Sequence, residues 1–194
     1  MTDFRFKRPN LDSEHPLRRL FREALDFVLP YSHTDRSITG YIEEQILCEF
    51  IHIDNLYRIR TAVGKRLEDI AEMLVEGDVL LDAQSFSREF QVHKHIGDYT
   101  LFMLGIFPEA LSRKKGREFI LGSIIVPDVN LSEYYILQGR RSYHIASEFY
   151  NRELFLELSS NFLLYKDILD LVRIYLESIK NREFLEVKRF ISRN

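Results

Sequence analysis

Apolar side chains recur three and four positions apart through most of this chain, and that spacing constrains its fold more than any other feature. The clearest example is residues 166–180, where the apolar positions are Ile168, Leu171, Val172, Tyr175, Leu176 and Ile179. Such positions share one face of an α-helix, which can be buried against a neighbouring helix. The same pattern predicts helices at residues 16–29, 40–52, 65–76, 85–107, 131–150, 152–165 and 183–191.

Local signals at the ends of these segments support the helical interpretation. His15-Pro16 is typical of a helix start, and Pro30 ends that helix. Asn130 followed by Glu133 resembles a capping box. The 194 residues include only 8 Gly and 5 Pro, with no repeat and no long linker. The sequence therefore predicts an all-α fold: one domain, residues 1–194, forming a compact multi-helix bundle of about seven to nine helices with at most one short extended segment. Residues 1–14 are expected to form an irregular N-terminal arm.

Three segments are less clear. Residues 54–64 fit no single pattern. Gly97-Asp98 is either a kink or a boundary between two helices, with Asp98 capping the second. Residues 119–126 include β-branched Ile124, Ile125 and Val126, but a single strand there has no obvious partner. We therefore interpret that segment as an extended or helical connection.

Charge and composition exclude several classes of partner. The net charge of −3 favours neither nucleic acid nor an anionic membrane. No apolar run approaches the roughly 20 residues that span a bilayer, and the first residues have no signal-peptide core. Cys48 is the single cysteine, so no internal disulfide is expected. These features predict a cytoplasmic protein with no membrane and no nucleic-acid partner.

Two basic clusters are interpreted as solvated surface. One comprises Arg113, Lys114, Lys115 and Arg117, which are expected to lie in a polar loop over residues 112–116 and its edge. The other comprises Arg18, Arg19 and Arg22. A nucleic-acid surface usually requires a broader basic stripe or a groove-reading helix, and neither is evident.

Glu49-Phe50-Ile51-His52 has the Glu-x-x-His spacing of carboxylate metal sites in helical bundles. His144 and Glu148 are four residues apart and could complete such a site. Because the motif occurs once, the preferred interpretation is a pair of solvated residues on one helix surface, and no metal is predicted. Metal binding is retained as an alternative.

His93-Lys94-His95 and Asp98 form the most polar cluster within an apolar region. His95 and Asp98 could act as a base and the residue that orients it, but no nucleophile accompanies them. A structural hydrogen bond is the preferred interpretation. Glycines interrupt the helical pattern nearby, which favours close helix crossings over a bound group: Gly97, Gly105 and Gly139.

Two blocks of sequence carry a resemblance. One runs from His95 to Leu111 and includes His95-Ile96-Gly97-Asp98-Tyr99-Thr100; the other is Tyr134-Tyr135-Ile136-Leu137-Gln138-Gly139-Arg140-Arg141-Ser142-Tyr143. Together they resemble an uncharacterised bacterial helical protein family of unknown function. The resemblance implies no activity, substrate or cofactor.

The sequence leaves two main classes of function open, and nucleic-acid binding through the basic loops is a third, weaker one. The first is a helical interaction or regulatory module without catalysis of its own, forming a homo-oligomer or binding a protein partner through a large exposed apolar patch. The alternative is a small-molecule- or metal-binding helical protein, an enzyme included, with a pocket that contains His95, Asp98, Glu109 and Tyr143. Neither a Gly-x-Gly-x-x-Gly nor a Walker motif occurs, and no cofactor is predicted.

Overall fold

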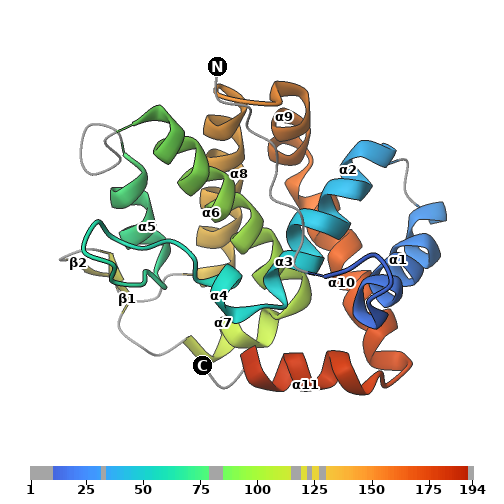
Figure 1. Cartoon of the computed structure of the whole chain (residues 1–194). Coiled ribbons are helices and arrows are strands. Elements are labelled where there is room, and N and C mark those ends of the chain that lie inside the picture. Colours follow the sequence, from blue (N-terminus) through green and yellow to red (C-terminus); the bar gives the residue numbers. More distant parts are fainter. Residues whose placement is uncertain are drawn as a thin grey trace.

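The computed structural model describes residues 11–31, 34–78, 85–114, 119–121, 124–126 and 130–191. Three long helices organise it: α6 (Phe86–Ile106), α8 (Leu131–Ser147) and α10 (Phe162–Ser178). Helix α6 lies at the centre and packs against both α8 and α10 (Figure 1). The predicted all-α helical bundle is confirmed.

Shorter elements surround this centre. Helices α1 (Pro16–Val28) and α9 (Arg152–Ser160) pack against α10 and α8 respectively. Helix α5 (Ile70–Gly77) packs on α6, and α11 (Arg182–Ile191) crosses the lower edge in Figure 1. The remaining elements are the 3₁₀ turn η1 (Leu29–Tyr31), α2 (Arg36–Tyr41), the π-helical segment η2 (Ile42–Leu47), α3 (Cys48–Phe50), α4 (Ile53–Leu56) and α7 (Pro108–Lys114).

Side-chain caps fix where several helices begin. The Asp35 carboxylate accepts from the Ser37 backbone N–H at the start of α2, and Asp69 serves the same role for α5. Asn130 caps α8 and also donates to the Glu133 carboxylate at 2.8 Å, which confirms the predicted cap. These contacts satisfy backbone donors that a helix leaves unpaired in its first turn.

Helix α6 is buried on every side from residue 92 to residue 106, so it is the core helix of the bundle. Glycines make its close crossings feasible. A Cβ added at Gly97 would lie 2.5 Å from Cδ1 of Tyr143 on α8, and one at Gly105 would collide with Leu169 on α10. A Cβ at Gly139 would collide with Thr100. The predicted use of these glycines in helix crossings is confirmed.

Helix α6 runs without interruption through Gly97 and Asp98, so the predicted alternative of a boundary between two helices is wrong. The start of α5 and the break between α9 and α10 also differ from prediction. The helix expected at residues 65–76 begins at Ile70, because Asp69 is its cap. The break expected near Tyr165 lies at Asn161, because a helical stripe indicates a face but not its ends.

The segment at residues 119–126 has a strand partner after all. Strand β1 (Phe119–Leu121) pairs antiparallel with β2 (Ile124–Val126), and Phe119 faces Val126. The predicted unpaired connection was wrong because the segment folds back on itself.

The predicted N-terminal arm and the loop at residues 112–116 are only partly within the described residues. Of the predicted N-terminal arm, residues 1–10 lie outside the described residues, and residues 11–14 contain no helix or strand. The expected loop at 112–116 is partly helical, because α7 continues to Lys114; Lys115 and Arg117 lie outside the described residues. Within the described ranges, no helix combines the length and apolarity needed to cross a membrane.

Candidate functional site

A fully buried ion pair with two tyrosine partners lies at the middle of α6. Asp98 has no exposed surface. Its Oδ1 atom accepts hydrogen bonds from the Tyr41 hydroxyl at 2.8 Å and the Tyr143 hydroxyl at 2.9 Å. Its Oδ2 atom lies 2.7 Å from Nζ of Lys94. We call these four residues the Asp98 network.

Three elements bring the network together. Lys94 and Asp98 are four residues apart, so they lie on the same face of α6 one turn from each other. Tyr143 reaches Asp98 from α8 because Gly97 leaves space for its ring. Tyr41 is the last residue of α2, where the helix passes into the π-helical segment η2. Such segments are frequent at functional sites.

Burial decides the protonation of the network. It raises the pKa of the Tyr41 and Tyr143 hydroxyls well above the ordinary value, and the nearby Asp98 carboxylate adds to this effect. Both hydroxyls therefore remain protonated and act as donors. Burial lowers the pKa of Lys94, and Asp98 opposes that shift. Three donors converge on one carboxylate, as a buried charge requires.

His95 does not pair with Asp98, although the two residues are three positions apart. The carboxylate is taken by Lys94 and the two tyrosines, and the His95 ring instead packs against Phe50 and Tyr99, with centroids 5.4 Å and 6.1 Å away. Burial first, then the charges of Arg58 and Lys94, lower the pKa of His95 well below its ordinary value, while the Leu56 backbone acts in the opposite direction. His95 is thus a neutral core residue, and the base-and-orienter hypothesis is wrong in this geometry.

Glu109 also lies apart from the network. It is in the first turn of α7 and pairs with Lys188 of α11 at 2.8 Å. Asp98 precedes the end of α6 at Ile106 by eight residues, which corresponds to about 12 Å along a helix axis. Of the four predicted binding residues, the structure joins only Asp98 and Tyr143 by a hydrogen bond.

The proposed metal ligands are also dispersed. Glu49 is buried rather than solvated, and it lies two residues after the π-helical segment η2. His144 and Glu148 are exposed, and Glu148 pairs with Arg152 at 2.9 Å. In the part of the chain that the structure describes, no group of three or more His, Cys, Asp or Glu side chains could hold a metal ion.

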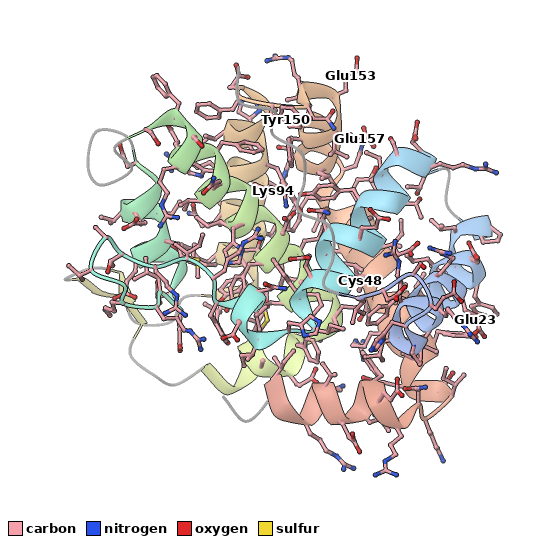
Figure 2. All side chains as sticks on the ribbon, in the orientation of Figure 1. Glu23, Cys48, Lys94, Tyr150, Glu153 and Glu157 are labelled. Carbon is pink, nitrogen blue, oxygen red and sulfur yellow. The ribbon has the colours of Figure 1, made fainter. Side chains whose placement is uncertain are left out.

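Sequence reasoning missed an open cavity of about 820 Å³ between α2–η2 and α9. Its wall includes Tyr41, so one residue both lines the cavity and donates a hydrogen bond to the buried Asp98. Figure 2 shows Glu153 and Glu157 along α9, with Lys94 further toward the centre of the bundle. The cavity is lined by Asp35, Arg36, Ser37, Ile38, Gly40, Tyr41, Glu44, Gln45, Asn151, Glu153, Leu154 and Glu157.

The lining of this cavity is acidic: four carboxylates face one guanidinium. Glu44 pairs with Arg18 at 2.6 Å, and Glu157 accepts from the Tyr165 hydroxyl at 2.6 Å. Glu153 is exposed in the first turn of α9 and forms no ion pair with the described residues. No sequence motif marks this site, because its two walls are more than a hundred residues apart in the chain.

The basic cluster of Arg18, Arg19 and Arg22 has a structural role. Arg18 and Arg22 of α1 both pair with Glu43 of η2, at 3.4 Å and 2.9 Å. Cys48 is buried, and burial raises the pKa of its thiol to about 12, which leaves it unreactive. The ion pairs of Arg18 and Arg22 with Glu43 attach α1 to the π-helical segment. The cavity lined by Tyr41 is therefore the accessible polar site next to the Asp98 network.

Comparisons of this chain with protein-family models, with curated proteins and with solved structures gave no match.

Proposed function

We propose that this protein is a regulatory module that binds a small organic cation in the cavity between α2–η2 and α9, without catalysis of its own. The observation that carries this proposal is the position of Tyr41, which lines the cavity and donates to Asp98 at 2.8 Å. A cavity of about 820 Å³ is within the usual range for small-molecule sites.

Charge supports a cationic ligand. The lining residues have a formal charge of −3, from Asp35, Glu44, Glu153 and Glu157 against Arg36, and the ion pair of Glu44 with Arg18 offsets part of it. Like charges gathered around a concave surface attract counter-ions of the opposite sign. Glu153 offers a carboxylate that no ion pair with the described residues occupies, and Ile38 and Leu154 provide apolar contact for a hydrocarbon chain.

Tyr41 offers a route from ligand to core. A ligand that shifts its ring also shifts a hydrogen bond to Asp98, and Asp98 joins α6 to α8 through Tyr143. The Lys94 ammonium also lies over the Tyr41 ring, 5.1 Å from its centroid. A ligand changes a conformational equilibrium when it interacts differently with the two states, and Tyr41 is placed to make that difference.

Binding fits this geometry better than catalysis. The ionisable groups of the Asp98 network are buried and already hydrogen-bonded to one another. His95 is sealed in the core, and its lowered pKa keeps it neutral. A general acid or base must reach the substrate, and of these groups only Tyr41 lines the cavity, where burial raises its pKa and keeps its hydroxyl protonated.

The test uses putrescine and spermidine as probes in isothermal titration calorimetry at low salt. We expect spermidine to bind more tightly, and Glu153→Gln to weaken binding severalfold. Glu183→Gln is the matched control, because Glu183 is an exposed carboxylate in the first turn of α11. Absence of binding by both amines, or equal losses in the two variants, would contradict the proposal.

The same titration followed by NMR separates binding from transmission. In the natural protein, spermidine should shift the backbone signals of α6 around Asp98. In Tyr41→Phe the ring still lines the cavity but the hydrogen bond to Asp98 is gone, so binding should persist while those shifts shrink. Unchanged shifts in Tyr41→Phe would contradict the route through Tyr41.

A second candidate function, protein interaction, is favoured by an exposed apolar stripe on α10. Leu164, Leu171 and Ile174 are 42%, 47% and 48% exposed on this helix. Beside them, Phe27 of α1 is 59% exposed and packs on Tyr175, with ring centroids 4.8 Å apart. Such a surface suits a second copy of the chain or another protein.

Light scattering across a range of concentrations tests this second candidate. A homodimer that Leu171→Glu converts to a monomer would support it. A monomer at every concentration would leave only a different protein partner, and equal self-association of the natural protein and Leu171→Glu would exclude this surface.

A further inference from the structure

A second cavity, of about 690 Å³, lies between α5 and α8. The segment before α5 forms its third side. It shares no lining residue with the cavity at Tyr41, and its lining is more apolar. The lining residues are Thr61, Lys65, Leu67, Ala71, Glu72, Leu74, Val75, Glu76, Tyr134, Gln138 and Arg141.

One wall of this cavity is apolar and the other is polar. Ala71, Leu74 and Val75 of α5 form the apolar wall, and Val75 is 47% exposed. Opposite them, Gln138 and Arg141 of α8 lie three residues apart and therefore share one helix face. A ligand in this cavity contacts hydrocarbon on one side and polar groups on the other.

The formal charges of the lining sum to zero, but both of its carboxylates are held in ion pairs, one of them with Arg88 outside the lining. Lys65 pairs with Glu72 at 2.9 Å, and Glu76 pairs with Arg88 at 2.7 Å. Arg141 makes no ion pair with the described residues. The cavity thus presents one guanidinium beside an apolar wall, and guanidinium binds carboxylate through two parallel hydrogen bonds.

Gln138 adds a second polar requirement. Its Oε1 atom is buried and accepts no hydrogen bond from the described residues. A buried acceptor without a donor is costly, so a ligand that supplies an O–H or N–H gains affinity when the Gln138 amide turns toward the cavity. That donor must lie close to the anionic group, because Gln138 is within one helical turn of Arg141.

We propose that the cavity between α5 and α8 binds a small amphipathic carboxylate, with the carboxylate on Arg141, a neighbouring hydroxyl or amide N–H on Gln138, and the hydrocarbon chain on Ala71, Leu74 and Val75. This ligand is opposite in charge to the one proposed for the Tyr41 cavity, and the two cavities have no lining residue in common.

His93 gives a local readout of the site. Burial first, and then the charge of Arg141, lower the pKa of His93 to about 4. A carboxylate on Arg141 offsets part of that charge. Ligand binding and Arg141→Gln are therefore both expected to raise the pKa of His93, which NMR of the imidazole ring measures.

The binding experiment uses sodium octanoate and 2-hydroxyoctanoate in isothermal titration calorimetry with the full chain. We expect both to bind, with the hydroxy acid tighter because it satisfies Gln138. Each methylene removed from the chain should weaken binding by on the order of fourfold, as burial of one methylene predicts. 1-Octanol, which has the chain but no carboxylate, should bind far more weakly.

Two pairs of variants locate the binding. Arg141→Gln should weaken octanoate about tenfold, as loss of a hydrogen bond to a charged group predicts. Arg182→Gln, at a 90% exposed arginine of α11, should have no effect. Val75→Ser should weaken octanoate severalfold, whereas Val63→Ser, at a 92% exposed valine, should not.

Octanoate binding that survives Arg141→Gln, or no binding of either acid to the folded protein, would overturn this proposal. Circular dichroism confirms that each variant is folded, and the exposed positions of Arg141 and Val75 make that the expected result. Glu153→Gln should leave octanoate binding unchanged, so a failure of the Tyr41 cavity and a failure of this one are distinguishable.

Discussion

Lys94→Met removes one of the two buried charges that form an ion pair in the core of this bundle. In the natural protein the Lys94 ammonium lies 2.7 Å from Asp98, and their side chains are 8% and 0% exposed. Methionine occupies a similar volume without charge, so the substitution leaves the Asp98 carboxylate in the core with two tyrosine donors. Removal of one partner of a buried ion pair typically costs about 3–5 kcal/mol.

The structure places the expected cost near the lower end of that range. The two tyrosine hydroxyls still hold Oδ1 of Asp98, so the carboxylate loses one of three donors rather than all of them. Removing Lys94 also removes the free-energy cost of burying its own ammonium group away from water. We therefore expect a loss of about 3 kcal/mol in the free energy of unfolding.

The double variant Lys94→Met/Asp98→Asn tests the origin of that loss. The amide oxygen of asparagine still accepts from Tyr41 and Tyr143, its N–H₂ group replaces Oδ2, and no charge remains in the Asp98 network. We expect the double variant to recover most of the stability, to within about 1 kcal/mol of the natural protein. The two substitutions are therefore strongly non-additive.

Urea denaturation followed by circular dichroism measures these differences. In thermal unfolding of a chain of this length, a loss of about 3 kcal/mol corresponds to a fall of roughly 6–12 °C in Tm. Lys166→Met is the matched control, because Lys166 pairs with Asp167 at 2.9 Å on the surface and should contribute under about 1 kcal/mol. A loss below about 1 kcal/mol in Lys94→Met, or additive losses in the double variant, would refute this reasoning.

Further expectations concern packing and pH. Gly105→Ala places a Cβ against Leu169 and should cost about 1–3 kcal/mol, whereas Gly40→Ala, which meets nothing within 4 Å, should be neutral or stabilising; thermal unfolding compares them. The pKa of His93 is about 4 in the folded chain and 6.5 ordinarily, so the unfolded chain takes up its proton first as pH falls. Stability should therefore drop between pH 6.5 and about 4, and His93→Gln should reduce the drop while His144→Gln, at an exposed site, leaves it unchanged.

Helix identity was predictable because the apolar spacing is local information. The stripe at 166–180 indicates a helix whatever it packs against, and the segment does lie within α10. Boundaries were less predictable, since they depend on which side chain caps the backbone. At residue 97 a glycine suggested a break, but the close passage of Tyr143 explains it instead.

The candidate sites were only half visible in the sequence. The polar cluster around Asp98 and the block ending at Tyr143 were recognisable, and the structure joins them at 2.9 Å. Tyr41, which completes the network, carries no local signal. Glu153 is equally ordinary in sequence and becomes notable only because α9 faces α2 across a cavity.

By itself, the sequence determined that this chain is helical and that α6 carries polar residues through an apolar region. Both follow from the spacing of side chains along a single helix. Only the tertiary structure decided which partner each polar group has. Asp98 could have capped a helix or oriented His95, and the outcome depended on α2 and α8 bringing Tyr41 and Tyr143 to a carboxylate that cannot be buried without donors.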